Sequence, residues 1–292
     1  MSDTRHTACL ICESTDLHAL KGYEETALQR CGSCSMVFAS KVADENMLRA
    51  FYGSGYNRTN YLSPITIQRY HELLDLFEPF RKTNKLLDVG AGCGFFLEVA
   101  KEKGWEVYGT EFSDDIVAHC REKGLDIRQG SLEQVGYDAD MFDVVICIEV
   151  IEHLVDPKRT AQEMHRIVRS GGCVYLTTPN FNALLRYRLK SRYNIISFPL
   201  HLSYFTSKTI GKMFGDAGFT TDRIWTTGYS KTRLRTSTGK SNQDYVSETS
   251  DDEMIRYRIE RNRSLRILKN VTNGLLNLFK VGDSLKARFI KK

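Results

Sequence analysis

The fold is decided by the stretch KLLDVGAGCG at residues 85–94, an apolar strand followed at once by a glycine-rich turn. A helix is predicted directly after it, over residues 95–103, and Gly104 ends that helix. Glycines let the backbone approach a ligand closely, and the start of a helix offers N–H groups without intrahelical partners. The stretch therefore predicts the first strand, ligand-binding loop and helix of an α/β fold.

The same alternation of strand and helix continues along the chain. Further strands are predicted over residues 105–109, 125–128, 142–148, 173–177, 219–226 and 285–290, and helices over 114–123, 156–172 and 207–217. Nearly continuous apolar strands between helices are typical of a parallel sheet that is covered on both faces. The predicted fold class is α/β, with a doubly wound, mostly parallel, Rossmann-like sheet of seven strands.

Four cysteines form two C-x2-C pairs near the start of the chain. Cys9 and Cys12 are separated by 18 residues from Cys31 and Cys34, with a hairpin-like stretch between the pairs. This spacing is typical of a zinc ribbon, and four thiolates leave no open position on the ion. We predict a structural zinc ribbon over residues 1–40. A helical connector is expected over 41–84, with short helices at 44–52 and from Pro64 to about residue 80, and the α/β domain over 85–292.

Composition points to an ordinary globular protein. The chain has 292 residues, of which 41% are hydrophobic and 26% charged. No apolar run approaches the roughly 18 residues of a membrane span, and the N-terminus lacks the apolar region of a signal peptide. We therefore expect a cytoplasmic location.

The positive charge is concentrated at the C-terminal end. The net charge is +5, but residues 221–292 hold 16 Lys and Arg against 8 Asp and Glu, so the rest of the chain is slightly acidic. Residues 228–281 are predicted to be an insertion that consists of a mobile loop over 229–249 and an amphipathic helix over 255–279.

Five arginines lie above an apolar stripe in that predicted helix. The pattern fits peripheral contact with anionic lipid at the inner face of the membrane through residues 254–280, and a homodimer helix or a solvated face fits equally well. The arginines are Arg256, Arg258, Arg261, Arg263 and Arg266.

The glycine loop favours one class of cofactor. Its spacing is G-x-G-x-G rather than the G-x-G-x-x-G of dinucleotide sites, and Asp88 stands just before it. A carboxylate there suits a ligand with an ammonium group, such as S-adenosylmethionine, better than a pyrophosphate. Glu111 ends the next strand, 21 residues beyond Gly90, where a carboxylate accepts ribose hydroxyls.

With these motifs, residues 85–292 resemble the class I S-adenosylmethionine-dependent methyltransferases. The resemblance is strongest to members whose fourth strand ends in Glu-x-x-Glu-His, here Glu149, Glu152 and His153. Together with the ribbon, the chain resembles bacterial methyltransferases of polysaccharide, lipopolysaccharide and deoxysugar pathways. The residues that the resemblance implies for the donor site are Asp88, Gly90, Ala91, Gly92, Gly94, Glu111, Phe112, Ser131, Leu132, Glu133, Ile148 and Glu149.

The Glu-Glu-His cluster has three possible roles. A neutral His153 can remove the proton of an acceptor hydroxyl as oxygen attacks the methyl group. Alternatively, Glu149, Glu152, His153 and the later His201 hold Mg²⁺ or Mn²⁺, as the resemblance to ubiquinone-pathway and small-RNA O-methyltransferases implies. A purely structural role as a hydrogen-bonded cluster is the third.

The acceptor is expected to be a small molecule or a glycan. The predicted reaction is O-methylation of a glycan, nucleotide-sugar or other small-molecule hydroxyl, and the aromatic and basic residues of 180–200 are expected to meet the acceptor. The alternatives are a metal-dependent RNA 2′-O-methyltransferase and a sugar C-methyltransferase. Residues 1–34 carry three Lys and Arg against five Asp and Glu, which disfavours nucleic acid as a partner of the ribbon.

Overall fold

The computed structural model describes residues 5–41, 62–239 and 251–292. The helix predicted over residues 44–52 lies outside these ranges. No helix in the described ranges is long and apolar enough to cross a membrane.

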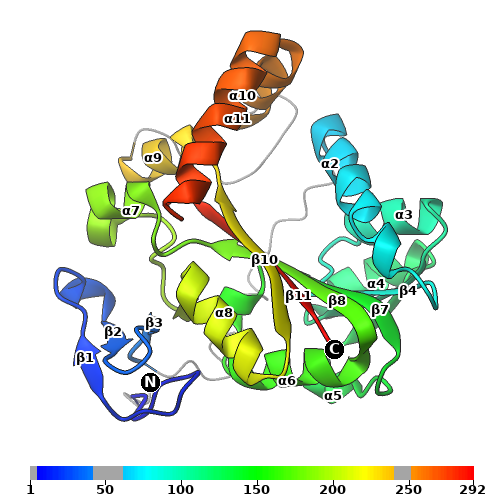
Figure 1. Ribbon diagram of the computed structural model, residues 1–292, viewed down its shortest axis with the longest axis horizontal. Helices are drawn as coiled ribbons and strands as arrows, with labels where there is room; N and C mark the ends of the chain where they lie inside the picture. Colours follow the sequence, from blue (N-terminus) through cyan, green and yellow to red (C-terminus); the bar gives the residue numbers. More distant parts are fainter. Residues whose placement is uncertain (1–4, 42–61, 240–250) are drawn as a thin grey trace.

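A sheet of seven strands forms the centre of the molecule (Figure 1). Its strand order is β10-β11-β8-β7-β4-β5-β6, and all neighbours are parallel except β11, which is antiparallel to both β8 and β10. The predicted doubly wound, mostly parallel sheet is confirmed. The strands are β4 (Lys85–Val89), β5 (Glu106–Glu111), β6 (Asp126–Gln129), β7 (Phe142–Ile148), β8 (Val168–Pro179), β10 (Thr220–Thr227) and β11 (Ser284–Ile290).

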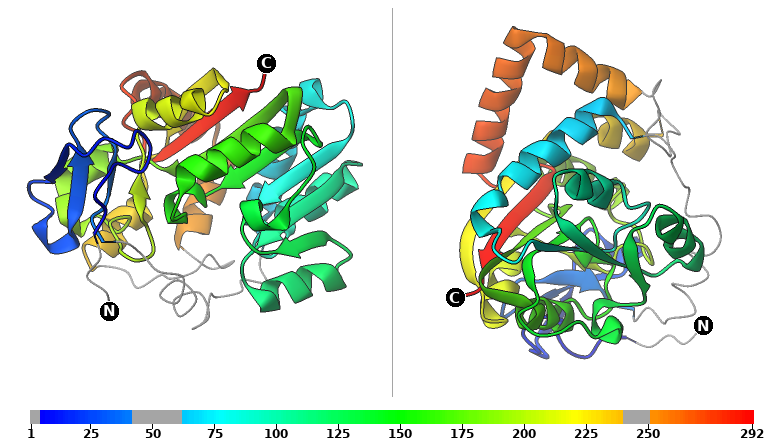
Figure 2. Two further views of the ribbon diagram at one scale, coloured as in Figure 1. Left: turned by 90° about the horizontal axis from the view of Figure 1, so that it is seen from below. Right: turned by 90° about the vertical axis from the view of Figure 1, so that its right-hand side faces the viewer.

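Helices cover both faces of this sheet because successive side chains of a strand point to opposite sides. Val145 and Cys147 of β7 pack in one core with α6 and α8, whereas Val144 and Ile146 pack in a second core with α3 and α4. Figure 2 shows the two helical layers on either side of the sheet. The helices are α2 (Pro64–Asp75), α3 (Phe95–Glu102), α4 (Asp114–Glu122), α5 (Leu132–Val135), α6 (Pro157–Ile167), α7 (Leu184–Leu189) and α8 (Ser207–Asp216).

The N-terminal ribbon shares a sheet with the α/β domain. The strands β1 (Leu17–Ala19), β2 (Leu28–Cys31) and β3 (Val37–Ala39) form an antiparallel meander, which confirms the predicted hairpin between the two C-x2-C pairs. A fourth strand, β9 (Ser203–Tyr204), pairs with β3 and comes from the chain after β8. The ribbon predicted over residues 1–40 therefore takes its last strand from the other domain.

Short 3-10 helices complete the chain, and one of them modifies a prediction. The helix expected to run from Pro64 to about residue 80 ends at Asp75 and is followed by a 3-10 turn. The 3-10 segments are η1 (Glu24–Thr26), η2 (Glu78–Phe80), η3 (Ile151–His153) and η4 (Lys190–Arg192).

The prediction that Gly171 and Gly172 end a helix is wrong, because both lie within strand β8. Helix α6 stops at Ile167, and Val168 already pairs with Phe142 of β7. A Cβ on Gly172 would lie 2.7 Å from the carbonyl oxygen of Asp143, so only glycine allows this approach of the two strands. Burial of Val168 against β7 outweighs the helical pattern.

The C-terminal insertion is more helical than predicted. Helix α9 (Lys231–Ser237) lies within the expected loop, where Ser230 caps it by accepting a hydrogen bond from the Arg233 N–H at 3.0 Å. The single helix expected over 255–279 is two helices, α10 (Asp251–Arg261) and α11 (Arg263–Leu278). Asn262 separates them because its side chain accepts a hydrogen bond from the Leu265 N–H and caps α11.

Asp143 is the buried anchor between β7 and the entry to β4. One carboxylate oxygen accepts hydrogen bonds from the N–H groups of residues 82–84 at 2.7–2.8 Å, and the other pairs with Arg169 at 2.5 Å. Burial alone would raise the pKa of Asp143, but these donors hold it below its usual value. The ionised form is therefore stabilised by folding, and this contribution is lost as the pH falls through the lowered pKa.

Asp143→Ala is expected to lower the free energy of unfolding by about 3–5 kcal/mol because it leaves the mostly buried Arg169 without its carboxylate partner. Asp222→Ala, which breaks an ion pair with Arg288 nearer the surface, is the matched control and is expected to cost under about 1 kcal/mol. Urea denaturation of both variants measures the difference. Equal losses in the two variants would contradict the anchoring role of Asp143.

Candidate active site

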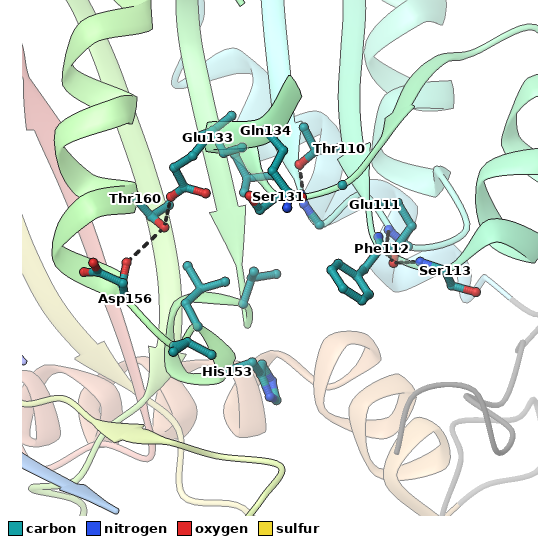
Figure 3. Close-up of a pocket in the computed structure, with 18 of the residues that line it drawn as sticks. Thr110, Glu111, Phe112, Ser113, Ser131, Glu133, Gln134, His153, Asp156 and Thr160 are labelled. Atoms are coloured by element: carbon teal, nitrogen blue, oxygen red, sulfur yellow. Dashed lines mark hydrogen bonds between the residues drawn. The ribbon is translucent and has the colours of Figure 1, made fainter. Parts of the chain in front are cut away.

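A cavity of about 600 Å³ opens at the carboxyl ends of β4 to β7. Parallel sheets bind ligands at this edge because the loops after neighbouring strands meet there. Figure 3 shows Glu111 and Phe112 on one side of the cavity, Glu133 and Thr160 on another, and His153 at a third. The predicted residues among its lining are Gly90, Gly92, Glu111, Phe112, Ser131, Leu132, Glu133, Glu149 and His153.

All three glycines of the glycine loop have positive φ angles, and two of them face the cavity. Gly90 has φ +73°, and a Cβ there would lie 2.6 Å from the side chain of Val150. Gly92 has φ +52°, and its N–H donates a hydrogen bond to Glu111 at 3.0 Å. The loop therefore needs glycine both for its conformation and for the close approach of the loop that follows β7.

Glu111 is held at the end of β5 by three backbone donors. One oxygen accepts from Gly92, and the other accepts from the N–H groups of Phe112 and Ser113 at 2.7 and 3.1 Å. These bonds orient the carboxylate at the cavity wall. This fixed position is what a group that recognises ligand hydroxyls requires.

The third wall is built by the start of α5. Ser131 and Gln134 form a capping box, with the Gln134 side chain accepting from the Ser131 N–H at 3.0 Å. The carboxylate of Glu133 accepts a hydrogen bond from the Thr160 hydroxyl at 2.5 Å. The capping box fixes the start of α5, and the Glu133–Thr160 contact attaches this wall to α6.

Several predicted site residues do not line the cavity. Asp88 is buried, and its pKa is raised well above the usual value, first by that burial and then by the charge of Glu111. Its role toward a donor stays a prediction. The predicted residues that are not part of the cavity lining are Asp88, Ala91, Gly94, Ile148, Glu152 and His201.

The loop after β7 turns sharply at Glu149, which has φ +54°. Its N–H donates to the Thr177 carbonyl of β8 at 2.9 Å, and its Oε1 accepts a hydrogen bond from the Thr177 hydroxyl at 2.8 Å. Glu152 is buried and accepts a hydrogen bond from the Thr178 hydroxyl at 3.0 Å. Burial and then the charge of Glu149 raise the pKa of Glu152. The two glutamates are thus held by neighbouring threonines of one strand.

The rings of His153 and His201 lie edge to face, with 65° between their planes. The Nδ1 of His153 lies 2.6 Å from the Leu200 carbonyl, the Nδ1 of His201 lies 2.6 Å from the Ile195 carbonyl, and the ring centroids are 4.8 Å apart. A carbonyl can only accept, so each Nδ1 carries the proton and each Nε2 has the lone pair in the neutral ring. Burial lowers the pKa of His153, and burial together with His153 lowers that of His201 to about 4.

Three of the four predicted cation ligands converge. Glu152, His153 and His201 each offer a ligand atom, and these atoms lie within 4.8 Å of one another. Glu149 is not part of this group. Carboxylate and imidazole ligands suit Mn²⁺ or Zn²⁺ and tolerate Mg²⁺, and a carbonyl on the opposite ring nitrogen is the usual way to orient a metal-binding histidine.

The ribbon cysteines also converge. The Sγ atoms of Cys9 and Cys34 are 3.5 Å apart, as are those of Cys12 and Cys31, and all four lie within 4.8 Å of one another. Tetrahedral zinc with bonds of about 2.3 Å places its sulfur ligands about 3.8 Å apart. The four thiols therefore fit the predicted structural zinc.

The ribbon reaches the active site through β9. Strand β3 pairs with β9, and the Ala39 N–H donates to the Leu202 carbonyl at 2.9 Å. The Leu202 N–H in turn donates to the Glu152 carbonyl at 2.8 Å. The segment that carries His201 thus lies between the ribbon and the Glu-Glu-His loop.

Sequence reasoning missed some site residues and misplaced others. Arg159 lines the cavity, and Arg233 of α9 raises no motif signal, yet its charge acts on Glu149 and His201. Phe181 and Tyr193 were expected to meet the acceptor, but they pack in a buried core. Their apolar area is better buried than exposed to a cavity.

Comparisons with known proteins agree with this geometry. A family model described as a methyltransferase domain matches residues 61–224. The ubiquinone biosynthesis O-methyltransferase of Pseudomonas aeruginosa (strain LESB58) is 37% identical over 105 residues, which is 34% of this chain and 45% of that protein. The protein of the same name from Methylococcus capsulatus is 36% identical over 103 residues, 33% of this chain and 44% of that one. The chain thus spans under half the length of these curated relatives.

A solved structure extends the likeness in fold. The crystal structure of a SAM-dependent methyltransferase from Archaeoglobus fulgidus matches 85% of this chain and 100% of that one, with a TM-score of 0.52 and 18% identity. At this identity the likeness concerns the fold alone.

Proposed function

Because the chain belongs to the methyltransferase-domain family, we propose that it transfers the methyl group of S-adenosylmethionine to a hydroxyl oxygen of a small molecule. The observation that carries this proposal is the position of His153, an imidazole with a lowered pKa at the wall of the cavity that the glycine loop and Glu111 also line.

The donor half of the cavity suits S-adenosylmethionine. When bound, this donor supplies an electrophilic methyl group on a sulfonium. Gly90 and Gly92 allow close approach of the backbone, and Glu111 presents an oriented carboxylate to hydroxyl groups. Ser131, Leu132 and Glu133 would enclose the flat base of the donor.

His153 has the properties of a base for the acceptor hydroxyl. Its Nδ1 proton is committed to the Leu200 carbonyl, so the lone pair of the neutral ring is on Nε2, which lies 3.8 Å from a carboxylate oxygen of Glu152. As the acceptor oxygen forms its bond to the methyl carbon, the bond between that carbon and the sulfur of the donor would break. The hydroxyl proton would pass to Nε2 of His153. A pKa below the usual value keeps the ring neutral, and therefore basic, at pH 7.

The wall near His153 favours an acceptor with an apolar body. Val150, Leu154, Val155 and Leu200 line this part, with Arg159 as a cation beside them. The curated relatives are named for ubiquinone biosynthesis, so the expected link to polysaccharide pathways gains no support from them. The assay described below therefore also includes nucleotide sugars, glycans and RNA as acceptors.

A divalent cation at Glu152, His153 and His201 is the second candidate mechanism. It is favoured by the convergence of the three ligand atoms and by the two carbonyls that orient the imidazoles. Such an ion would polarise the acceptor oxygen and lower the pKa of its proton. His153 would then act as a ligand rather than as a base.

Transfer of labelled methyl from S-adenosylmethionine to a panel of hydroxylated aromatics, nucleotide sugars, glycans and RNA tests the proposal. Labelled product in which the methyl is attached to oxygen is the expected result. Methyl found on carbon or nitrogen, or no donor binding in calorimetry, would overturn it.

A chelator arm separates the two mechanisms. Full activity after chelation, with the ribbon zinc shown by elemental analysis to be retained, supports His153 as a base. Loss of activity that Mn²⁺ or Mg²⁺ restores supports the cation. His201→Ala is the companion variant. It removes one of the three cation ligands, so activity that Mn²⁺ or Mg²⁺ restores should be lost in this variant only if the second mechanism holds.

A further inference from the structure

Helix α11 exposes its apolar side. Six large apolar residues are each more than half exposed, and at 100° per residue they fall on about one third of the helix circumference. In ordinary surface helices this stripe faces the core. We call these residues the outer stripe: Ile267, Leu268, Val271, Leu275, Leu278 and Phe279.

The opposite, polar side of α11 attaches the helix to the protein. Asn277 accepts a hydrogen bond from the Thr226 N–H of β10 at 3.1 Å, and Asn273 accepts from the Gly228 N–H at 2.9 Å. The Thr226 hydroxyl donates to the Leu276 carbonyl. The helix is therefore fixed in an orientation that keeps the outer stripe away from the core, and Figures 1 and 2 show α10 and α11 projecting from the body.

The surroundings of the outer stripe are strongly basic. Residues 255–280 carry seven Lys and Arg against one acid, Glu260. That acid already pairs with Lys269 and with Arg69 of α2, both through Oε1. Arg263 and Arg266 are both exposed, and at 100° per residue Arg263 falls near the edge of the stripe whereas Arg266 falls on the polar side of α11. A helix with an apolar stripe on one side and excess positive charge on its polar side is typical of a membrane interface.

We propose that the outer stripe and the cations around it seat the protein on an anionic lipid bilayer. The apolar side chains enter the boundary between headgroups and acyl chains, and the arginines meet phosphate groups. A second copy of the chain is the less favoured occupant, because two such faces would bring together like charges, whereas anionic lipid supplies the opposite charge.

Vesicle co-sedimentation of the full chain tests the proposal. Binding to phosphatidylcholine vesicles that contain phosphatidylglycerol is expected to exceed binding to phosphatidylcholine alone by about tenfold or more, and to weaken as salt is added. Equal binding to the two kinds of vesicle would overturn it.

Two double variants distinguish the effect of the outer stripe from that of exposed leucines elsewhere on the surface. Leu268→Gln with Leu275→Gln is expected to lower binding to anionic vesicles about tenfold or more, with an unchanged melting temperature because both side chains are exposed. Leu76→Gln with Leu184→Gln, at 50% exposure each but outside the stripe, is the matched control and should retain binding. Equal loss in the two double variants contradicts a role for the stripe.

Two further experiments test the role of the positive charge and the possibility that a second copy of the chain covers the stripe. Arg263→Gln with Arg266→Gln should weaken binding to anionic vesicles and flatten its salt dependence. Analytical ultracentrifugation reports on the second copy. A stable dimer that Leu268→Gln with Leu275→Gln dissociates, together with absence of vesicle binding by the unaltered chain, would replace the lipid surface with a dimer interface.

Discussion

His153→Ala is expected to lower kcat for methyl transfer by about 10²–10⁴-fold. The reason is that the variant removes the Nε2 lone pair at the cavity wall, whether that nitrogen accepts the hydroxyl proton or binds a cation. The affinity for S-adenosylmethionine should change by less than about threefold, because the glycine loop and Glu111 are untouched. Single-turnover kinetics and calorimetry measure the two quantities separately.

The matched control for this variant is His119→Ala on α4, which lies outside the cavity lining. It should leave kcat and donor affinity unchanged. An equal loss of donor binding and of turnover in His153→Ala would show that the residue supports the donor site rather than the proton transfer or the cation.

Cys31→Ser is expected to release the ribbon zinc and to lower methyl transfer severely, although none of the cavity-lining residues belongs to the ribbon. Structural zinc contributes on the order of 10 kcal/mol or more to the folding of small zinc domains, so three ligands will not hold the ribbon together. Loss of the β3–β9 pairing then frees the segment that bonds Glu152 and carries His201.

Ser33→Ala is the control, because Ser33 lies in the same C-x2-C turn and offers no thiolate. Zinc content, kcat and hydrogen exchange of residues 195–206 are measured together. The expected result in Cys31→Ser is loss of zinc, low kcat and faster exchange in that segment. Zinc loss with normal kcat would show that the active site stands without the ribbon.

The predictable part of the fold rests on local patterns. Strands β4 and β7 were located to the residue because each is a short apolar run that ends in a turn, and the seven-stranded sheet followed from the alternation. The start of β8 was misplaced because glycines usually end helices, and only the contact of Gly172 with β7 shows why they lie within a strand. Helix α9 was missed because a Ser- and Thr-rich stretch resembles a loop.

The residues that carry the chemistry can be picked out from the chain alone, because the glycine loop, Glu111, the Glu-Glu-His cluster and the four cysteines stand at characteristic spacings. How they come together depends on the fold. His201 meets His153 because a strand of the ribbon pairs with β9. The stripe of α11 faces outward because Asn277 bonds β10 and Asn273 bonds Gly228 just after it. The physical reason is that both arrangements depend on hydrogen bonds between residues far apart in the chain, which no periodicity or motif records.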